Sequence, residues 1–303
     1  MSPFWSGWVI ALIIFNLGVT LFLFVWGLKV KIPTEPDGTS GHVWAHGVLR
    51  EGVKNLPKWW IALSGGMFAC GFIYLALYPG FGRSKGILGW TSQLEVARDT
   101  AANELTLGPL MRRYSTLTVE DLSRDPTALG IGQRLFIDNC AACHGRLGHG
   151  NPLLGAPNLT DDDWLYGGDG KSMLTSIEDG RRGVMPPFVG VFGEAGVANL
   201  ANYVRSLSNS PHDASKAAAG KPLFTVCSAC HGPEGKGNIA IGAPNLTDHV
   251  WLYGGDIKTI EETIRNGRGG VMPAWRTRLD PQDVRVIAAW VYAQSHGHAV
   301  LGP

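Results

Sequence analysis

The chain has little charge of either sign. Of its 303 residues, 26 are Lys or Arg and 25 are Asp or Glu, so the formal net charge is only +1. A nucleic-acid-binding surface needs an excess of basic side chains, and nothing in the composition suggests one. A convincing run of alternating strand residues is also lacking, so we expect a mainly α-helical fold.

Cysteine is scarce as well, and four of the five cysteines fall in two copies of one pentad. The copies are Cys140-Ala141-Ala142-Cys143-His144 and Cys227-Ser228-Ala229-Cys230-His231. This spacing lets two thiols on one helical turn reach the two vinyl groups of a porphyrin while the adjacent imidazole binds its iron. We therefore expect two covalently attached haem c groups with His144 and His231 as axial ligands, and no disulfide.

A lone Cys-x-x-Cys pair also occurs in zinc sites and in thioredoxin-like redox centres. In this chain both copies continue with His and Gly, and Met-Pro follows 45 residues after the first cysteine of each. These shared features favour haem, and a four-cysteine zinc site is the main alternative.

The two pentads belong to an internal repeat with an offset of 87 residues. Between Cys140 and Met185, 28 of 46 positions are identical to their counterparts between Cys227 and Met272. Such self-similarity indicates a duplicated domain. We expect a first haem domain over residues 126–208 and a second over residues 209–303.

Within each copy the pattern predicts an opening helix, an irregular loop, a short helix, a methionine loop and a closing helix. The opening helices are expected over residues 127–139 and 217–226. Thr160 and Thr247 are the expected N-caps of the turns that follow them, and Gly180 and Gly267 the expected ends of the short helices.

Met185 and Met272 occupy equivalent places in the repeat and are the expected sixth ligands of the two irons. His/Met ligation raises the reduction potential and leaves no open coordination site, which favours electron transfer over chemistry at iron. The simple pairing joins Met185 to the haem of His144. Near-identical halves can exchange an element at little cost, so the pairing stays open.

Other repeated residues are candidates for the surroundings of the haems. Pro157 and Pro244 would offer backbone carbonyls to the histidine rings, and Arg181 and Arg268 would face the propionates. Four aromatic residues are candidates for propionate hydrogen bonds or for the pocket wall: Trp164, Tyr166, Trp251 and Tyr253.

Residues 4–28 and 59–78 are apolar stretches long enough to cross a bilayer as helices. They would form a membrane anchor over residues 1–90, followed by a tether over residues 91–125. Because their interiors lack His and charged residues, these helices cannot ligate haem or carry a proton path by themselves. The loop between them is basic, with Lys29, Lys31, Arg50, Lys54 and Lys58.

A basic loop is typical of the cytoplasmic side of a membrane. Both termini and the haem domains would then lie on the periplasmic side of a bacterial inner membrane, where c-type haems are attached. The soluble part, residues 91–303, holds 19 Lys or Arg against 22 Asp or Glu, and such a mildly acidic surface could steer a basic cytochrome.

The segment Tyr78-Pro79-Gly80-Phe81-Gly82, followed by Lys85-Gly86 and Leu88-Gly89-Trp90-Thr91-Ser92, completes a pattern with the apolar stretches and the pentads. Over essentially the whole chain this pattern resembles the diheme subunit III of cbb3-type cytochrome c oxidases. The resemblance implies two tandem class I cytochrome c domains and no catalysis by this chain on its own.

It further implies that electrons from a donor cytochrome c pass through these haems to a monohaem subunit. They would then reach the catalytic subunit, which carries haem b and a haem-copper centre. Two alternatives remain in other classes. One is a membrane-anchored diheme shuttle or dehydrogenase cytochrome subunit; the other is a diheme cytochrome c peroxidase, which would need one iron able to open its sixth position.

Overall fold

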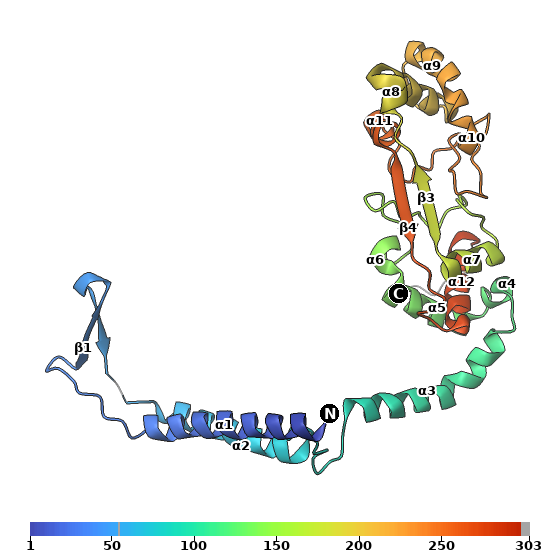
Figure 1. The fold of residues 1–303 in the computed structure, drawn as a ribbon. Coiled ribbons are helices and arrows are strands. Elements are labelled where there is room, and N and C mark those ends of the chain that lie inside the picture. Colours follow the sequence, from blue (N-terminus) through green and yellow to red (C-terminus); the bar gives the residue numbers. More distant parts are fainter. Residues whose placement is uncertain (54, 298–303) are drawn as a thin grey trace. The chain divides into compact units, whose positions relative to one another are not determined.

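The computed structural model describes residues 1–53 and 55–297. Lys54 of the basic loop and the last six residues of the expected second haem domain lie outside this part. The chain forms two compact units, one from Met1 to Thr106 and one from Leu107 onward. Each unit is described by itself, and Figure 1 labels their elements.

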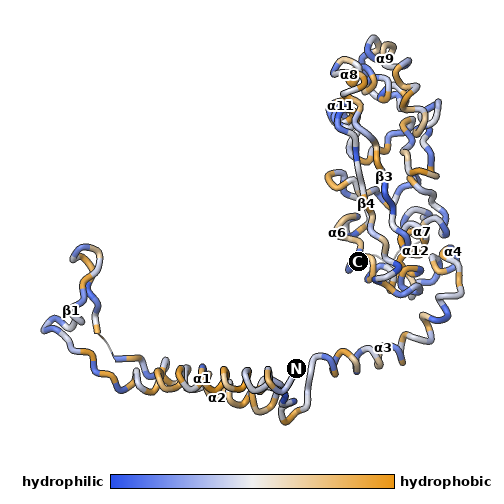
Figure 2. Tube along the Cα trace, viewed as in Figure 1, coloured by the Kyte–Doolittle hydropathy of each residue, from blue (hydrophilic) through white to orange (hydrophobic). Residues whose placement is uncertain are grey.

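The first unit contains two long apolar helices, α1 (Pro3–Gly27) and α2 (Lys58–Leu77). Their bounds agree with the expected apolar stretches to within one residue. Both helices are long and apolar enough to cross a membrane, and their apolar residues are not buried inside the chain. Figure 2 shows them as almost continuously hydrophobic, as lipid-facing helices must be.

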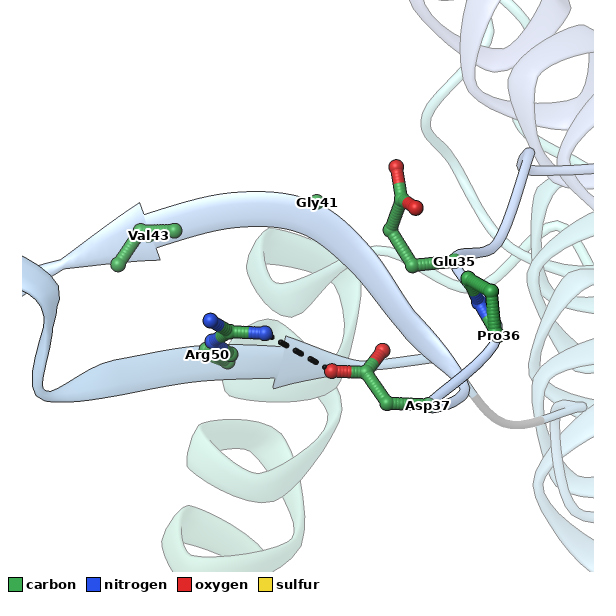
Figure 3. Close-up of a pocket in the computed structure, with 6 residues that line it drawn as sticks. All are labelled: Glu35, Pro36, Asp37, Gly41, Val43 and Arg50. Atoms are coloured by element: carbon green, nitrogen blue, oxygen red, sulfur yellow. Dashed lines mark hydrogen bonds and ion pairs between the residues drawn. The ribbon is translucent and has the colours of Figure 1, made fainter.

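A small hairpin connects the two helices. It consists of β1 (Thr39–Trp44), the 3-10 turn η1 (Ala45–Gly47) and β2 (Leu49–Gly52). At its base Arg50 Nη1 lies 2.9 Å from Asp37 Oδ2, beside Glu35, Pro36, Gly41 and Val43 (Figure 3). Because both partners are exposed, this ion pair adds little stability.

The segment after α2 folds back onto α1. The backbone N–H of Arg83 donates to Ser6 Oγ at 3.0 Å, and Ser6 is the buried residue of α1. Gly86 has φ +68°, and a Cβ there would overlap the carbonyl of Leu77, so this close turn requires glycine. The motif after residue 78 therefore joins the two membrane helices at one end.

The helix α3 (Ser92–Tyr114) crosses the division between the units and is longer than the polar tether suggests. The second unit is otherwise built from elements shorter than α3. These are α4 (Val119–Leu122), α5 (Pro126–Asn139), α6 (Ala141–His144), α7 (Gly170–Asp179), β3 (Arg181–Met185), α8 (Val189–Leu207), α9 (Ala214–Gly220), the 3-10 helix η2 (Lys221–Thr225), α10 (Ser228–His231), α11 (Ile257–Asn266), β4 (Arg268–Met272) and α12 (Pro281–Ser295).

The strands β3 and β4 form an antiparallel ribbon, which the sequence did not lead us to expect. Arg181 lies opposite Met272 and Met185 opposite Arg268, with Gly183 opposite Gly270 at the centre. Each strand alternates half-buried and exposed residues, but five residues with two central positions of glycine give too weak a period for recognition. The ribbon connects the two repeats along its whole length (Figure 1).

Each repeat packs its closing helix on the opening helix of the other repeat. The first core joins α5 and α7 to α12, and the second joins α8 to α9, η2 and α11. The ring centroids of Phe136 and Trp290 are 4.4 Å apart, and those of Tyr203 and Phe224 are 5.2 Å apart. Each core therefore takes helices from both sides of residue 208.

The expected helix over residues 217–226 is wrong in detail, because α9 gives way to the 3-10 helix η2. Gly132 and Gly220 make equivalent close approaches, to the carbonyls of Val286 and Asn199. Cys140 lies eight positions after Gly132, whereas Cys227 lies only seven positions after Gly220. A 3-10 helix rises more per residue than an α-helix, so it compensates for the missing residue.

The expected N-caps at Thr160 and Thr247 are also wrong, because the segments that follow them form bends and no helical turn, and the next helices, α7 and α11, are capped by Asp169 and Asp256. The two threonines instead donate, through N–H and hydroxyl, to the side chains of Asn158 and Asn245. The expected ends at Gly180 and Gly267 are confirmed, with φ of +71° and +73°.

Candidate functional site

Each pentad forms a single helical turn that presents its histidine to a core. His144 is 8 % exposed, and its Nδ1 lies 3.1 Å from the carbonyl oxygen of Pro157. His231 Nδ1 lies 2.9 Å from the carbonyl oxygen of Pro244. A carbonyl oxygen can only accept, so Nδ1 carries the proton in each ring and Nε2 keeps its lone pair for a metal.

The electrostatics favour the neutral rings that iron ligation requires. Burial lowers the pKa of His144 and of His231, and the hydrogen bond to the proline carbonyl opposes this only in part. A neutral imidazole whose other nitrogen is held by a carbonyl is the usual form of a metal-bound histidine.

The cysteines of each pentad differ in environment. Cys140 packs against the first core and Cys227 against the second, whereas Cys143 and Cys230 are exposed. Burial, with a smaller effect of Cys143, raises the pKa of the Cys140 thiol to about 11, and burial also raises that of Cys227. Zinc needs thiolates, and raised pKa values disfavour them.

The four pentad cysteines are divided between two cores. Among residues 1–53 and 55–297, no group of three or more His, Cys, Asp or Glu side chains is placed to hold a metal ion. This geometry does not support a four-cysteine zinc site. The donor set in each core, a thiol pair and an imidazole with a free Nε2, fits a c-type haem.

The two methionines lie on the inner side of the ribbon and are exchanged between the cores. Met272, from the second repeat, packs against the first core, which holds the pentad turn of His144. Met185, from the first repeat, packs against the second core, with Cys227. Met173 is 3 % exposed in the first core and serves there as a packing residue.

The repeated arginines lie beside the methionines of the opposite repeat, because the ribbon pairs Arg181 with Met272 and Arg268 with Met185. Arg181 Nε donates to Ser176 Oγ at 2.9 Å, and Arg268 Nε donates to Thr263 Oγ1 at 2.9 Å. Both guanidinium groups are thus fixed at the ends of the ribbon. A cation held there could balance a propionate.

The four aromatic candidates divide into two kinds. Trp164 packs against the first core and Trp251 against the second, as pocket walls would. Tyr166 lies under Arg181, with 4.5 Å from the guanidinium carbon to the ring centroid, and Tyr253 lies under Arg268 at 4.4 Å. Cation–π contact is the usual attraction in such stacks.

The fold brings carboxylates of the two repeats close enough to repel each other, which the sequence does not predict. Burial, the carboxylate of Asp248 and that of Asp161 together raise the pKa of Asp163 to about 6. Asp163 is the last of a run of three aspartates and is replaced by Val250 in the second repeat. Only the fold brings Asp248 near it, so no local pattern could reveal the pair.

We expect Asp163→Asn to stabilise the protein near neutral pH. A raised carboxyl pKa means that the folded state favours the protonated form of Asp163. The protonated carboxyl therefore adds to the free energy of unfolding at acidic pH, and this contribution is lost as the pH rises through about 6. After allowance for solvent screening the variant should gain about 1–2 kcal/mol at pH 7. Urea unfolding between pH 7.5 and 4.5 should show this gain shrinking toward zero at the acidic end.

The exposed neighbour offers a matched control. Asp162→Asn should change the free energy of unfolding by less than about 0.5 kcal/mol, as surface substitutions commonly do. An Asp163→Asn variant that is no more stable than the parent at pH 7 would contradict the assignment.

Comparison with known proteins agrees with this geometry. The family described as "Cytochrome C oxidase, cbb3-type, subunit III" matches residues 127–204 and 215–291, one match for each repeat. The family described as "N-terminal domain of cytochrome oxidase-cbb3, FixP" matches residues 36–85. This second match covers the hairpin, α2 and the turn that packs onto α1.

Whole-chain relatives carry the same description. The chain is 40% identical over 297 residues to the cbb3-type cytochrome c oxidase subunit CcoP of Rubrivivax gelatinosus, covering 98% of this chain and 96% of the relative. It is 40% identical to subunit FixP of Bradyrhizobium sp. (strain ORS 278), covering 86% and 95%, and 35% identical to subunit CcoP of Cereibacter sphaeroides, covering 88% and 97%. With both repeats and the membrane end matched, the chain belongs to the subunit III family of cbb3-type cytochrome c oxidases, the membrane-anchored diheme cytochromes of that complex.

Proposed function

We propose that each core binds one haem c through two thioether bonds, from Cys140 and Cys143 in the first and from Cys227 and Cys230 in the second. Bound in this way, the haem supplies a one-electron redox centre. The chain's own residues fix its position. His144 and His231 would ligate from one side with the ring orientation set by the carbonyls of Pro157 and Pro244.

The sixth ligands would be crossed between the repeats. Met272 would serve the haem of His144, and Met185 that of His231. The single observation that carries this proposal is the packing of each methionine against the core of the other repeat's pentad. Two thioether-ligated irons have no open position for substrate, which favours electron transfer over peroxidase chemistry.

The arginines complete the proposed surroundings. Arg181 would face the haem beside Met272, and Arg268 the haem beside Met185, since each pair is joined across the ribbon. The hydroxyl partners of the guanidinium Nε atoms leave terminal N–H groups that can reach an anion. Trp164 and Trp251 would wall the two pockets.

We further propose that this chain passes electrons without catalysing oxygen reduction itself. A donor cytochrome c would reduce its haems, and a monohaem subunit would convey the electrons to the catalytic subunit with haem b and the haem-copper centre. The haem-bearing unit and both termini would lie on the periplasmic side of the bacterial inner membrane. The loop lysines and Arg50 support this orientation.

The test is a quantitative one on the purified oxidase and on the isolated chain. The account expects two covalent haems per chain, rapid oxidation of a reduced donor cytochrome by the complex, and no rapid turnover when the isolated reduced chain is mixed with peroxide. Peroxide turnover would favour a diheme peroxidase instead. Purification without any oxidase subunit would favour a shuttle or dehydrogenase subunit.

A further inference from the structure

We call each core, together with the pentad that it holds, a haem unit. The two haem units contact each other through one tyrosine from each repeat. The ring of Tyr166, from the first repeat, lies against Gly242 of the second, where a Cβ would overlap the ring. The ring of Tyr253, from the second repeat, lies in the same way against Gly155 of the first. Both glycines have positive φ, +70° and +67°, and neither backbone conformation nor space allows another residue there.

The glycines belong to the loops behind the two histidines. Gly242 stands two residues before Pro244, whose carbonyl accepts from His231, and Gly155 stands two residues before Pro157, whose carbonyl accepts from His144. Each loop is closed by a short bridge, Asn151 with Ala156 or Asn238 with Ala243. Each tyrosine ring therefore contacts the loop that carries the hydrogen-bond acceptor of His144 or His231.

Each tyrosine also contacts the ribbon. Arg181 covers Tyr166 and Arg268 covers Tyr253, with 4.5 and 4.4 Å to the ring centroids. A Cβ at Gly183 or Gly270 would lie 3.7 or 3.8 Å from the corresponding phenol oxygen. Each ring thus contacts both the arginine beside one methionine and the loop behind the histidine of the other unit.

We propose that Tyr166 and Tyr253 are positioning residues that set the separation of the two haem units for electron transfer between them. The inference rests on the proposed function. In the step they serve, one electron moves between the units, so that one centre is oxidised as the other is reduced, with no bond made or broken and no proton moved. Because tunnelling falls steeply with distance, a small loosening of either contact slows this step.

The test uses the full holoprotein with Tyr166→Ala, Tyr166→Phe and Gly242→Ala. The first variant removes the ring, the second keeps it without the hydroxyl, and the third forces it away from the loop. Gly193→Ala is the matched control, because Gly193 has a positive φ of +63° and nothing within 4 Å of a Cβ. It therefore also places an alanine at a positive φ, but without the overlap.

Two readouts are needed besides haem content and the midpoint potentials. One is the rate of inter-haem transfer after a light pulse, and the other is the magnetic interaction between the two ferric centres by EPR, which reports their separation. We expect Tyr166→Ala and Gly242→Ala to slow the transfer several-fold and to weaken the magnetic interaction, with two His/Met haems retained. Tyr166→Phe and Gly193→Ala should match the parent.

Several outcomes would overturn the proposal. These are an unchanged rate and EPR interaction in Tyr166→Ala, a loss in Tyr166→Phe as large as in Tyr166→Ala, or an equal loss in Gly193→Ala. If Gly242→Ala fails to assemble, Tyr166→Ala still decides, because it adds no overlap. Failure of the proposed function is a separate result, visible in the parent protein as fewer than two haems.

Discussion

Replacing both Cys227 and Cys230 with alanine is expected to leave one covalent haem per chain. Thioether bonds require these thiols, and the first pentad lies in a different core. The second core should also lose stability, since a repeat of this size buries limited surface on its own. A haem-stained gel with a haem-to-polypeptide ratio measures the first effect, and hydrogen exchange of α9 and α11 the second.

The chain supplies its own control in Cys70, which lies outside both pentads in α2. Cys70→Ala should keep two haems per chain. If the Cys227 and Cys230 double variant also kept two, the second attachment site would be assigned wrongly.

The second large effect is expected from Trp290→Ala. Trp290 belongs to the second repeat, but its buried ring packs on Phe136 of the first. Removal of a buried tryptophan commonly costs about 3–5 kcal/mol, and here the cost should fall on the first haem unit. Hydrogen exchange should show faster exchange in α5, with α9 little changed.

Tyr203→Ala gives the reciprocal experiment, because Tyr203 packs on Phe224 and should loosen α9 and η2 while sparing α5. Its effect should be smaller, since the Tyr203 side chain is only half-buried. Loosening of α9 by Trp290→Ala would mean that the closing helices are not exchanged.

The local features of the fold were readable from the sequence because they depend on residues close in the chain. The two apolar stretches, the pentad turns and the helix ends at Gly180 and Gly267 all follow from composition or spacing within a few residues. The offset of 87 residues also identified Met185 and Met272 as equivalent.

The sequence does not predict which of the two repeats each closing helix and each methionine packs against. Because the repeats are alike, the apolar pattern of α12 around Val284 and Trp290 does not indicate which repeat's core it completes. The ribbon that pairs the two repeats was equally hard to predict, because its short strands with central glycines carry almost no periodic signal. The contact of Tyr166 with Gly242 was not predicted for the same reason. Both residues are repeated, at Tyr253 and Gly155, but the repetition does not say that they meet.

The crossed ligation of the two irons is tested most directly in chains that hold a single haem. In the chain with Cys227 and Cys230 replaced, only the haem beside His144 remains. There Met272→Ala should open the iron to carbon monoxide and lower its potential, whereas Met185→Ala should leave both properties unchanged. If Met185→Ala instead opened that iron, each repeat would ligate its own haem and the account would be wrong.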